Sequence, residues 1–188
     1  GLAIGKRINE WNWRQGDAFT VNFTPFNRIF IYKNGTHELY NREKDPLTIC
    51  GLYIGSILGT VITDLYAERN VGPGLVVNNK NDPGPVLQNA YFESNDLKNE
   101  SKGAWQFYIS PNSDCAINNL YLLHRKNQIG FVDANAKLAI NNWMSGISIY
   151  AKDVKTMNKI IFSGYALGGM FFKNNENSYL RKALFQSN

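Results

Sequence analysis

The patterned segments of this chain are short, and nearly all of them have the composition of β-strands. Runs of β-branched and aromatic residues alternate with clusters of Gly, Pro, Asn and Asp, and no long segment has helical periodicity. Strands at such spacing, without helical patterns between them, are typical of an antiparallel sandwich or barrel. The sequence therefore predicts an all-β fold, an antiparallel β-sandwich.

The predicted elements are distributed along the whole chain. Asn34-Gly35 supplies the two positive-φ positions of a tight hairpin turn between strands at 29–32 and 38–40. One helical turn is expected at 154–157. The other expected strands lie at 18–23, within the Gly-punctuated run 47–62, and at 105–109, 119–124, 129–133, 147–151 and 159–163.

A short phrase recurs in the chain at a separation of domain length. Trp13-x-x-Gly16 and Trp143-x-x-Gly146 are each followed by an Asn-basic-apolar string. The period of about 130 residues indicates duplicated domains, because solenoid repeats are only roughly 20 to 50 residues long. The breaker-rich segment 71–85 is then the expected linker between a partial domain, 1–70, and a nearly complete one, 86–188.

The composition is that of a folded protein without the marks of nucleic-acid binding. Apolar residues make up 44% of the 188 residues and aromatic residues 13%, which is enough to build a core. The net charge of +5 comes from Lys and Arg scattered singly, with no basic run that would follow a phosphate backbone. The longest apolar candidate, residues 49–65, is interrupted by glycines and polar residues. We therefore expect a globular chain with no nucleic-acid partner and no transmembrane segment.

The cellular compartment is left open by the sequence. Asn-x-Ser/Thr triplets begin at Asn22, Asn34 and Asn99 and could accept glycans in a secreted chain, but such triplets also arise by chance. An extracellular location is slightly favoured. Cys50 and Cys115 are compatible with one disulfide bridge or with two free thiols. Because the chain has neither an initiator Met nor a signal peptide, we expect a processed or excised piece.

The sequence contains no motif for catalysis or for a cofactor. There is no nucleophile-elbow pattern, and two separated histidines with two distant cysteines cannot be interpreted as a zinc site. The glycine-rich segment 164–169 lacks the Lys-Ser/Thr of a phosphate loop and indicates a bend or close strand packing. A carboxylate pair formed only in space would not be visible in the sequence. The prediction is a non-enzymatic protein with no metal and no other cofactor.

Two groups of residues have spacings typical of a known family. The first group is Arg7, Trp11-x-Trp13, Gly16, Phe19, Asn34-Gly35-x-His37, Tyr40, Arg42, Ile49, Leu52 and Ile54. The second is Leu122-Leu123-His124-x-Lys126-x-Gln128 and Val132-x-x-Asn135-Ala136, followed by Trp143. Both groups resemble motifs of the galectins, the β-galactoside-binding lectins, and of the tandem-domain nematode members in particular. The resemblance implies a galectin-like jelly roll, partial in residues 1–70 and nearly complete in residues 86–188.

The resemblance also implies a sugar-binding site made of His124, Lys126, Gln128, Asn135 and Trp143. Trp143 would stack on the apolar face of a galactose, while His124 and Asn135 would hydrogen-bond its hydroxyls. The alternatives for single residues are a Trp143 that caps a sandwich edge and a His124 with a structural role. The expected function is that of a lectin-like module that binds β-galactoside-type glycans or glycoproteins.

The sequence departs from the galectin pattern at positions that orient the sugar. The family's Asn and Arg are replaced by Lys126 and Gln128, and the Glu and Arg after its tryptophan by Gly146 and Ser148. An Arg and a Glu normally form a charge-assisted network there. The alternative is a galectin-like sandwich that has lost sugar binding and acts as a structural or protein-protein interaction module, with a partner chain completing its exposed strands.

Overall fold

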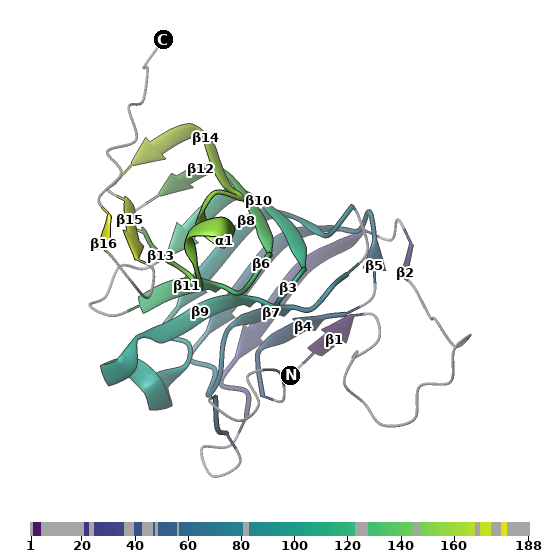
Figure 1. The fold of residues 1–188 in the computed structure, drawn as a ribbon. Helices are drawn as coiled ribbons and strands as arrows, with labels where there is room; N and C mark the ends of the chain where they lie inside the picture. Colours follow the sequence, from purple (N-terminus) through teal and green to yellow (C-terminus); the bar gives the residue numbers. More distant parts are fainter. Residues whose placement is uncertain are drawn as a thin grey trace, which may run out of the picture.

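Two large, mainly parallel sheets enclose a shared core (Figure 1). The structure, a computed structural model, describes residues 2–4, 21–22, 25–35, 40–42, 47, 49–55, 57–80, 83–122, 128–144, 147–167, 170–173 and 178–179. The first sheet has eight strands in the order β1-β4-β7-β9-β11-β13-β15-β16, and the second has six in the order β14-β12-β10-β8-β6-β3. All neighbouring strands in these sheets are parallel except β15 and β16.

The strands are between two and nine residues long. The eight-stranded sheet contains β1 (Leu2–Ile4), β4 (Leu52–Ile54), β7 (Leu75–Val77), β9 (Ala104–Ile109), β11 (Gln128–Val132), β13 (Ile147–Ala151), β15 (Met170–Lys173) and β16 (Ser178–Tyr179). The six-stranded sheet contains β3 (Phe26–Tyr32), β6 (Val61–Glu68), β8 (Val86–Glu93), β10 (Asp114–Leu122), β12 (Lys137–Met144) and β14 (Ile160–Leu167). The remaining elements are the paired strands β2 (Val21–Asn22) and β5 (Ile57–Leu58), the 3-10 helix η1 (Leu97–Lys102) and the single-turn helix α1 (Val154–Met157).

The chain winds as a solenoid, because successive long strands alternate between the two sheets. β4 and β6 make one coil, β7 and β8 the next, and β9 with β10, β11 with β12, and β13 with β14 follow in the same way. Each strand inside the two sheets, apart from β15, pairs with the strands one coil before and one coil after it. The colours in Figure 1 accordingly change steadily from coil to coil across both sheets. In such an architecture each repeat is supported mainly by its neighbours.

The predicted antiparallel, galectin-like sandwich is wrong. Parallel strands need a crossover connection between them, and here the crossover is the strand of the opposite sheet. Residues 71–85, expected to be a linker, contain β7, which pairs with β4 and β9, so the eight-stranded sheet continues through them. β3 pairs in parallel with β6, and the strand expected at 38–40 lies outside the described residues except for Tyr40, which is in no strand.

The predicted types of the individual elements agree with the structure more closely than their predicted arrangement does. Strands are present at 29–32, 105–109 and 147–151, and in the run 47–62 as β4, β5 and the start of β6. The helical turn α1 spans the predicted residues, and the side chain of Asp153 caps it by accepting a hydrogen bond from the Thr156 N–H. Cys50 and Cys115 are both free and buried, so no bridge joins them.

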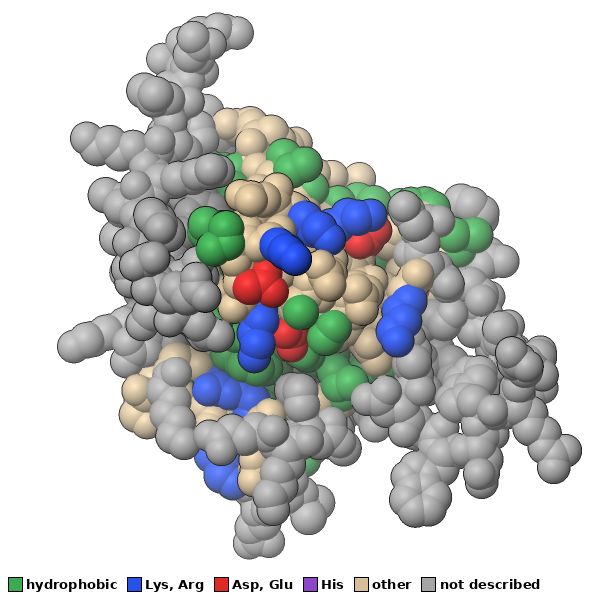
Figure 2. Space-filling model, in the orientation of Figure 1, with side chains coloured by type: hydrophobic (Ala, Val, Ile, Leu, Met, Phe, Trp, Pro, Cys, Tyr) green, Lys and Arg blue, Asp and Glu red, His purple; other side chains and the backbone are tan. Residues whose placement is uncertain are grey.

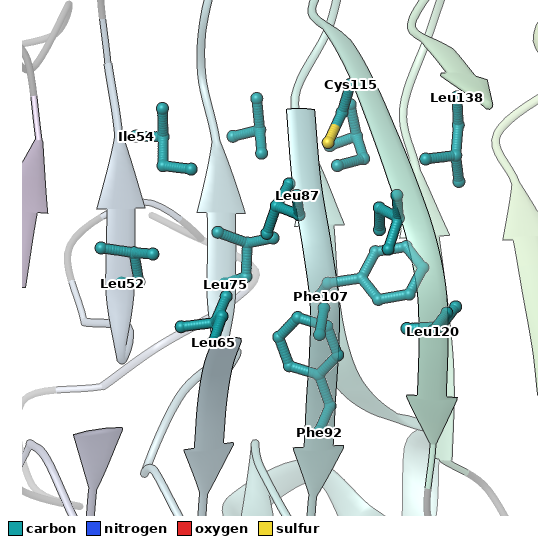
Figure 3. Packing of buried hydrophobic residues seen from close by; sticks show 14 of the residues in the cluster. Leu52, Ile54, Leu65, Leu75, Leu87, Phe92, Phe107, Cys115, Leu120 and Leu138 are labelled. Atoms are coloured by element: carbon teal, nitrogen blue, oxygen red, sulfur yellow. The ribbon is translucent and has the colours of Figure 1, made fainter. Parts of the chain in front are cut away.

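Registered apolar residues stack in rows between the two sheets. One row of the six-stranded sheet is Ile62, Leu87, Ile117 and Ile140, and one row of the eight-stranded sheet contains Leu52, Leu75 and Phe107. Figure 3 shows side chains of this core, with Leu52, Leu75 and Phe107 on neighbouring strands. Each fully buried side chain of this size stabilises the fold by roughly 1.5 to 3 kcal/mol.

The ring of Phe107 fills the space beside Gly130, its register partner on β11. A Cβ on Gly130 would lie 2.1 Å from Cζ of Phe107. The register shifts at this point, because Ile129 pairs with Trp105 whereas Gly130 pairs with Phe107. The intervening residue, Gln106, is fully buried and its side chain bonds to Asn95. The irregularity therefore allows a polar side chain to join a buried network.

A network of amides crosses several coils at the carboxyl ends of the six-stranded sheet's strands. Oδ1 of Asn95 accepts hydrogen bonds from the backbone and side-chain N–H groups of Asn70, at 3.2 and 2.7 Å. Its Nδ2 donates to the carbonyl of Ala67 and to Oε1 of Gln106, at 2.9 and 3.2 Å. Oδ1 of Asn70 in turn accepts from both nitrogens of Asn34. Asn70, Asn95 and Gln106 are fully buried, so these bonds hold neighbouring coils together without competition from water.

A buried ion pair fastens the segment 40–42 against the outside of the eight-stranded sheet. Nη1 of Arg42 lies 2.5 Å from Oδ2 of Asp96 and donates to the carbonyl of Gly103, and the guanidinium lies over the ring of Trp105. Asp96 also accepts from the Trp105 N–H and the Asn99 side chain. Burial nevertheless dominates and raises the pKa of Asp96 above its usual value, whereas the hydrogen bonds and Arg42 act to lower it.

Candidate functional site

The outer face of the six-stranded sheet carries a column of residues in the left-handed backbone region. These are Arg28, Asp64, Asn89, Asn119, Asn142 and Gly164, with φ between 56° and 80°. Asn and Asp tolerate this conformation better than other non-glycine residues, which explains their recurrence at equivalent places in β6, β8, β10 and β12. At Gly164 a Cβ would also collide with Oδ1 of Asn142, 2.3 Å away.

The side chains of four of these residues, Asp64, Asn89, Asn119 and Asn142, form a hydrogen-bonded line that we call the amide row. Nδ2 of Asn89 donates to Oδ1 of Asp64 at 2.8 Å, Nδ2 of Asn119 to Oδ1 of Asn89 at 2.9 Å, and Nδ2 of Asn142 to Oδ1 of Asn119 at 3.1 Å. All three bonds lie at the surface. An amide has two N–H donors and an oxygen with two lone pairs. Within the part of the chain that the structure describes, Asn89 and Asn119 each use one donor in the row, which leaves the other for a ligand.

Two residues further along each strand, aromatic rings make a second line, the aromatic row, of Phe30, Tyr66, Tyr91 and Tyr121. Their centroids are 4.7, 4.4 and 4.6 Å apart in turn, and the rings are within 13° of parallel. The faces of Tyr66 and Tyr91 are therefore occupied by their neighbours. Ring edges and hydroxyl groups remain to contact a ligand.

Two glutamates continue the face at the carboxyl ends of β6 and β8. The hydroxyl of Tyr66 donates to Oε2 of Glu68 at 2.8 Å, and that of Tyr91 donates to Oε2 of Glu93 at 2.5 Å. Burial, followed by these bonds to carboxylates, raises the pKa of both tyrosines, so their hydroxyls stay protonated as hydrogen-bond donors at neutral pH. The face thus combines amides, phenols and carboxylates on adjacent coils.

The structure does not bring the predicted sugar-binding residues together. Trp143 is 1% exposed on the inward side of β12, where its ring meets Phe162 edge-on at 5.7 Å, so it offers no face to a sugar. Gln128 is buried in β11 of the other sheet. Asn135 is exposed in the turn before β12, and its N–H donates to Oγ1 of Thr156. His124 and Lys126 lie outside the described residues, as do Trp11 and Trp13 of the first group.

The sequence holds a repeat that would have pointed to the observed face. Asp64-Leu65-Tyr66-Ala67-Glu68 and Asn89-Ala90-Tyr91-Phe92-Glu93 share the order Asx-apolar-Tyr-apolar-Glu, and Asn119-Leu120-Tyr121 repeats its first half. In each copy the apolar residues point into the core while Asx, Tyr and Glu point outward. Strand-by-strand interpretation missed this period because each copy also fits an ordinary alternating strand.

No metal site and no membrane-spanning helix are found in the described ranges. No three or more His, Cys, Asp or Glu side chains there are grouped so that they could hold a metal ion. None of the helices among the described residues is long and apolar enough to cross a bilayer. Comparison of the chain with protein-family models, with curated proteins and with solved structures found no match.

Proposed function

We propose that this protein binds an extended glycan on the outer face of the six-stranded sheet. The observation that carries the proposal is the amide row beside the aromatic row, which presents similar polar groups on successive coils. Neighbouring strands lie about 4.7 to 4.9 Å apart, so a ligand along the solenoid axis would meet a carboxylate and a phenol on β6 and then an amide and a phenol on each of β8 and β10. A polymer of similar units is suited to such a repeating surface.

The chemistry of the face favours a hydroxyl-rich ligand. Sugar hydroxyls both donate and accept hydrogen bonds, and the face supplies amide donors at Asn89 and Asn119 and carboxylate acceptors at Glu68 and Glu93. Bridging waters would extend these contacts at little cost in affinity. The edges of the tyrosine rings add apolar contact for sugar C–H groups. This mode differs from the stacking on Trp143 that the galectin resemblance implied.

A second candidate is association with another protein, favoured by exposed apolar side chains at the margins of the same sheet. Phe30 on the first strand of the sheet is 67% exposed and Ile161 on the last is 63% exposed. These side chains lie at opposite ends of the sheet and do not form one apolar patch, whereas the polar rows between them are continuous. The glycan proposal therefore takes precedence. The proposal is one of binding without catalysis.

The test measures retardation of the protein in native gels that contain single soluble polysaccharides, among them dextran, xylan and alginate. We expect at least one to retard the wild-type protein, and Tyr91→Ala to weaken that interaction about tenfold, equivalent to 1.4 kcal/mol. The matched control is Tyr150→Ala, because Tyr150 is also a half-buried tyrosine stacked on an aromatic ring, but on the other sheet.

A second pair of variants tests the amide row without changing the backbone. Asn119→Gly removes one amide at φ 58°, a conformation that glycine adopts easily, and Asn112→Gly makes the same change at φ 58° in a turn outside the row. We expect Asn119→Gly to weaken binding and Asn112→Gly to leave it intact. If no polysaccharide retards the wild-type protein, or if each variant behaves like its control, the proposal is wrong.

A further inference from the structure

A groove opens on the same outer face, at the amino-terminal ends of β8, β10, β12 and β14. It has a volume of about 410 Å³, within the range of small-molecule sites. Val86, Ala116 and Ala139 lie on adjacent strands along its floor, and Ile161 and the segment Pro83-Gly84-Pro85 contribute to its lining. It crosses four coils, so it runs in the same direction as the amide row.

Small side chains create this groove. Ala116 and Ala139 extend only a methyl group from the sheet, so a ligand can come close to the backbone of β10 and β12. Gly84 is required where its chain passes over β10, because a Cβ there would lie 2.1 Å from the carbonyl oxygen of Asp114. The floor is apolar and suits the C–H surface of a sugar ring better than its hydroxyls.

The charges at the edge of the groove are unequal. Nζ of Lys137 lies 3.1 Å from Oδ2 of Asp114, so these two charges compensate each other. Nζ of Lys159 is 3.4 Å from Oδ1 and 3.5 Å from the carbonyl oxygen of Asn135, which are neutral groups. Among the described residues, Lys159 has no ion pair. Figure 2 shows several Lys and Arg side chains, with fewer acidic ones between them, on the side of the molecule where α1 lies.

We propose that the groove binds a sugar unit that carries a single negative charge, a carboxylate or a sulfate ester, with the anion at Lys159 and the C–H surface on Val86, Ala116 and Ala139. This inference rests on the proposed glycan binding and specifies the class of glycan. Glu93 and Glu68 lie at the opposite, carboxyl ends of β8 and β6, away from the groove, and the charge of Glu68 is compensated by Arg69, whose Nε lies 2.9 Å from Oε1.

The experiment compares charged and neutral forms of the same oligosaccharides by isothermal titration calorimetry at about 0.1 M salt, where surface charges are screened beyond roughly 10 Å. One pair is alginate oligosaccharides before and after reduction of their carboxyl groups, and the other is sulfated and unmodified dextran oligosaccharides. We expect the wild-type protein to bind the charged member of at least one pair about tenfold more tightly. The pair that shows the preference identifies the anion.

Two variants locate the preference within the groove. Lys159→Gln is expected to abolish the preference, so that the charged and neutral oligosaccharides bind with equal affinity. Lys152→Gln is the control, because Lys152 is exposed, does not line the groove and carries the same charge. Ala139→Leu fills the groove without a change of charge and is expected to reduce binding of the charged oligosaccharide as well.

The failure of this inference can be distinguished from the failure of the proposed function. If neither charged nor neutral oligosaccharides bind, glycan binding itself is wrong. If the wild-type protein binds charged and neutral forms equally, the groove does not select an anion and only the inference is overturned. The same conclusion follows if Lys152→Gln loses the preference as fully as Lys159→Gln does, because the attraction would then reflect net charge.

Discussion

The buried amide network makes a strong prediction for Asn95→Ala. The side chain of Asn95 takes part in four buried hydrogen bonds, two with Asn70, one with the carbonyl of Ala67 and one with Gln106. At about 1 kcal/mol net for each bond, the substitution should reduce the free energy of unfolding by roughly 4 kcal/mol. A protein domain has only about 5 to 15 kcal/mol in total, so this is a large fraction.

Urea denaturation followed by circular dichroism and by tryptophan fluorescence measures the effect. The urea concentration at the midpoint of unfolding should fall, while the slope of the free energy of unfolding against urea concentration stays nearly constant. Circular dichroism and fluorescence should give coincident transitions. The matched control is Asn89→Gly, which removes two hydrogen bonds of the exposed amide row and keeps a residue that tolerates φ 58°. It should cost no more than about 1 kcal/mol, because water replaces the lost partners. A loss in Asn95→Ala no greater than that of the control would refute the reasoning.

Two further predictions concern the core and the buried ion pair between Arg42 and Asp96. Gly130→Ala places a methyl group against the ring of Phe107 and should lower the free energy of unfolding, measured by thermal unfolding, by about 1 to 3 kcal/mol. Adding Phe107→Leu should recover part of this loss. If it does not, the clash is not the cause. Because burial raises the pKa of Asp96, its contribution to stability is complete below pH 3.8 and is lost as pH rises through the folded-state pKa. Free energies of unfolding measured from pH 3 upward should fall less steeply for Asp96→Asn than for the wild-type protein, and equal slopes would contradict this.

Local structure was largely predictable from the sequence because it depends on local patterns. Alternating or continuous β-branched and aromatic residues identified most of the strands, and the segment 154–157 formed the single helical turn expected of it. The partners of those strands depend instead on contacts between coils. An alternating strand fits an antiparallel or a parallel neighbour equally well, so the pattern alone did not distinguish a sandwich from a solenoid.

The Asn34-Gly35 pair is a strong hairpin signal in a sequence. In the structure Asn34 joins the amide network through Asn70, and β3 pairs in parallel with β6. Residues 38 and 39 of the expected returning strand lie outside the described residues. The long-period phrase at Trp13 and Trp143 predicts duplicated domains. The described strands repeat with a shorter unit, a single coil of variable length: fewer residues separate Gly130 from Ile149 than Leu75 from Phe107.

The candidate site was missed for a related reason. Trp143 was assigned a sugar-stacking role from its place in a motif, but it lies at an inward position of β12 and is covered by the core. The residues that do reach the surface, such as Asn89 and Tyr91, are individually ordinary. Only their registration across coils makes them a candidate site, and this registration requires the solenoid.

The amide row also has a direction. Each amide donates toward the preceding coil, from Asn142 to Asn119, from Asn119 to Asn89, and from Asn89 to the carboxylate of Asp64. The side-chain dipoles therefore align head to tail, and the two ends of the row differ. A polymer with distinct reducing and non-reducing ends would not bind equally well in both orientations. The protein would bind such a polymer in one orientation, and labelling one end of the polymer would show which orientation that is.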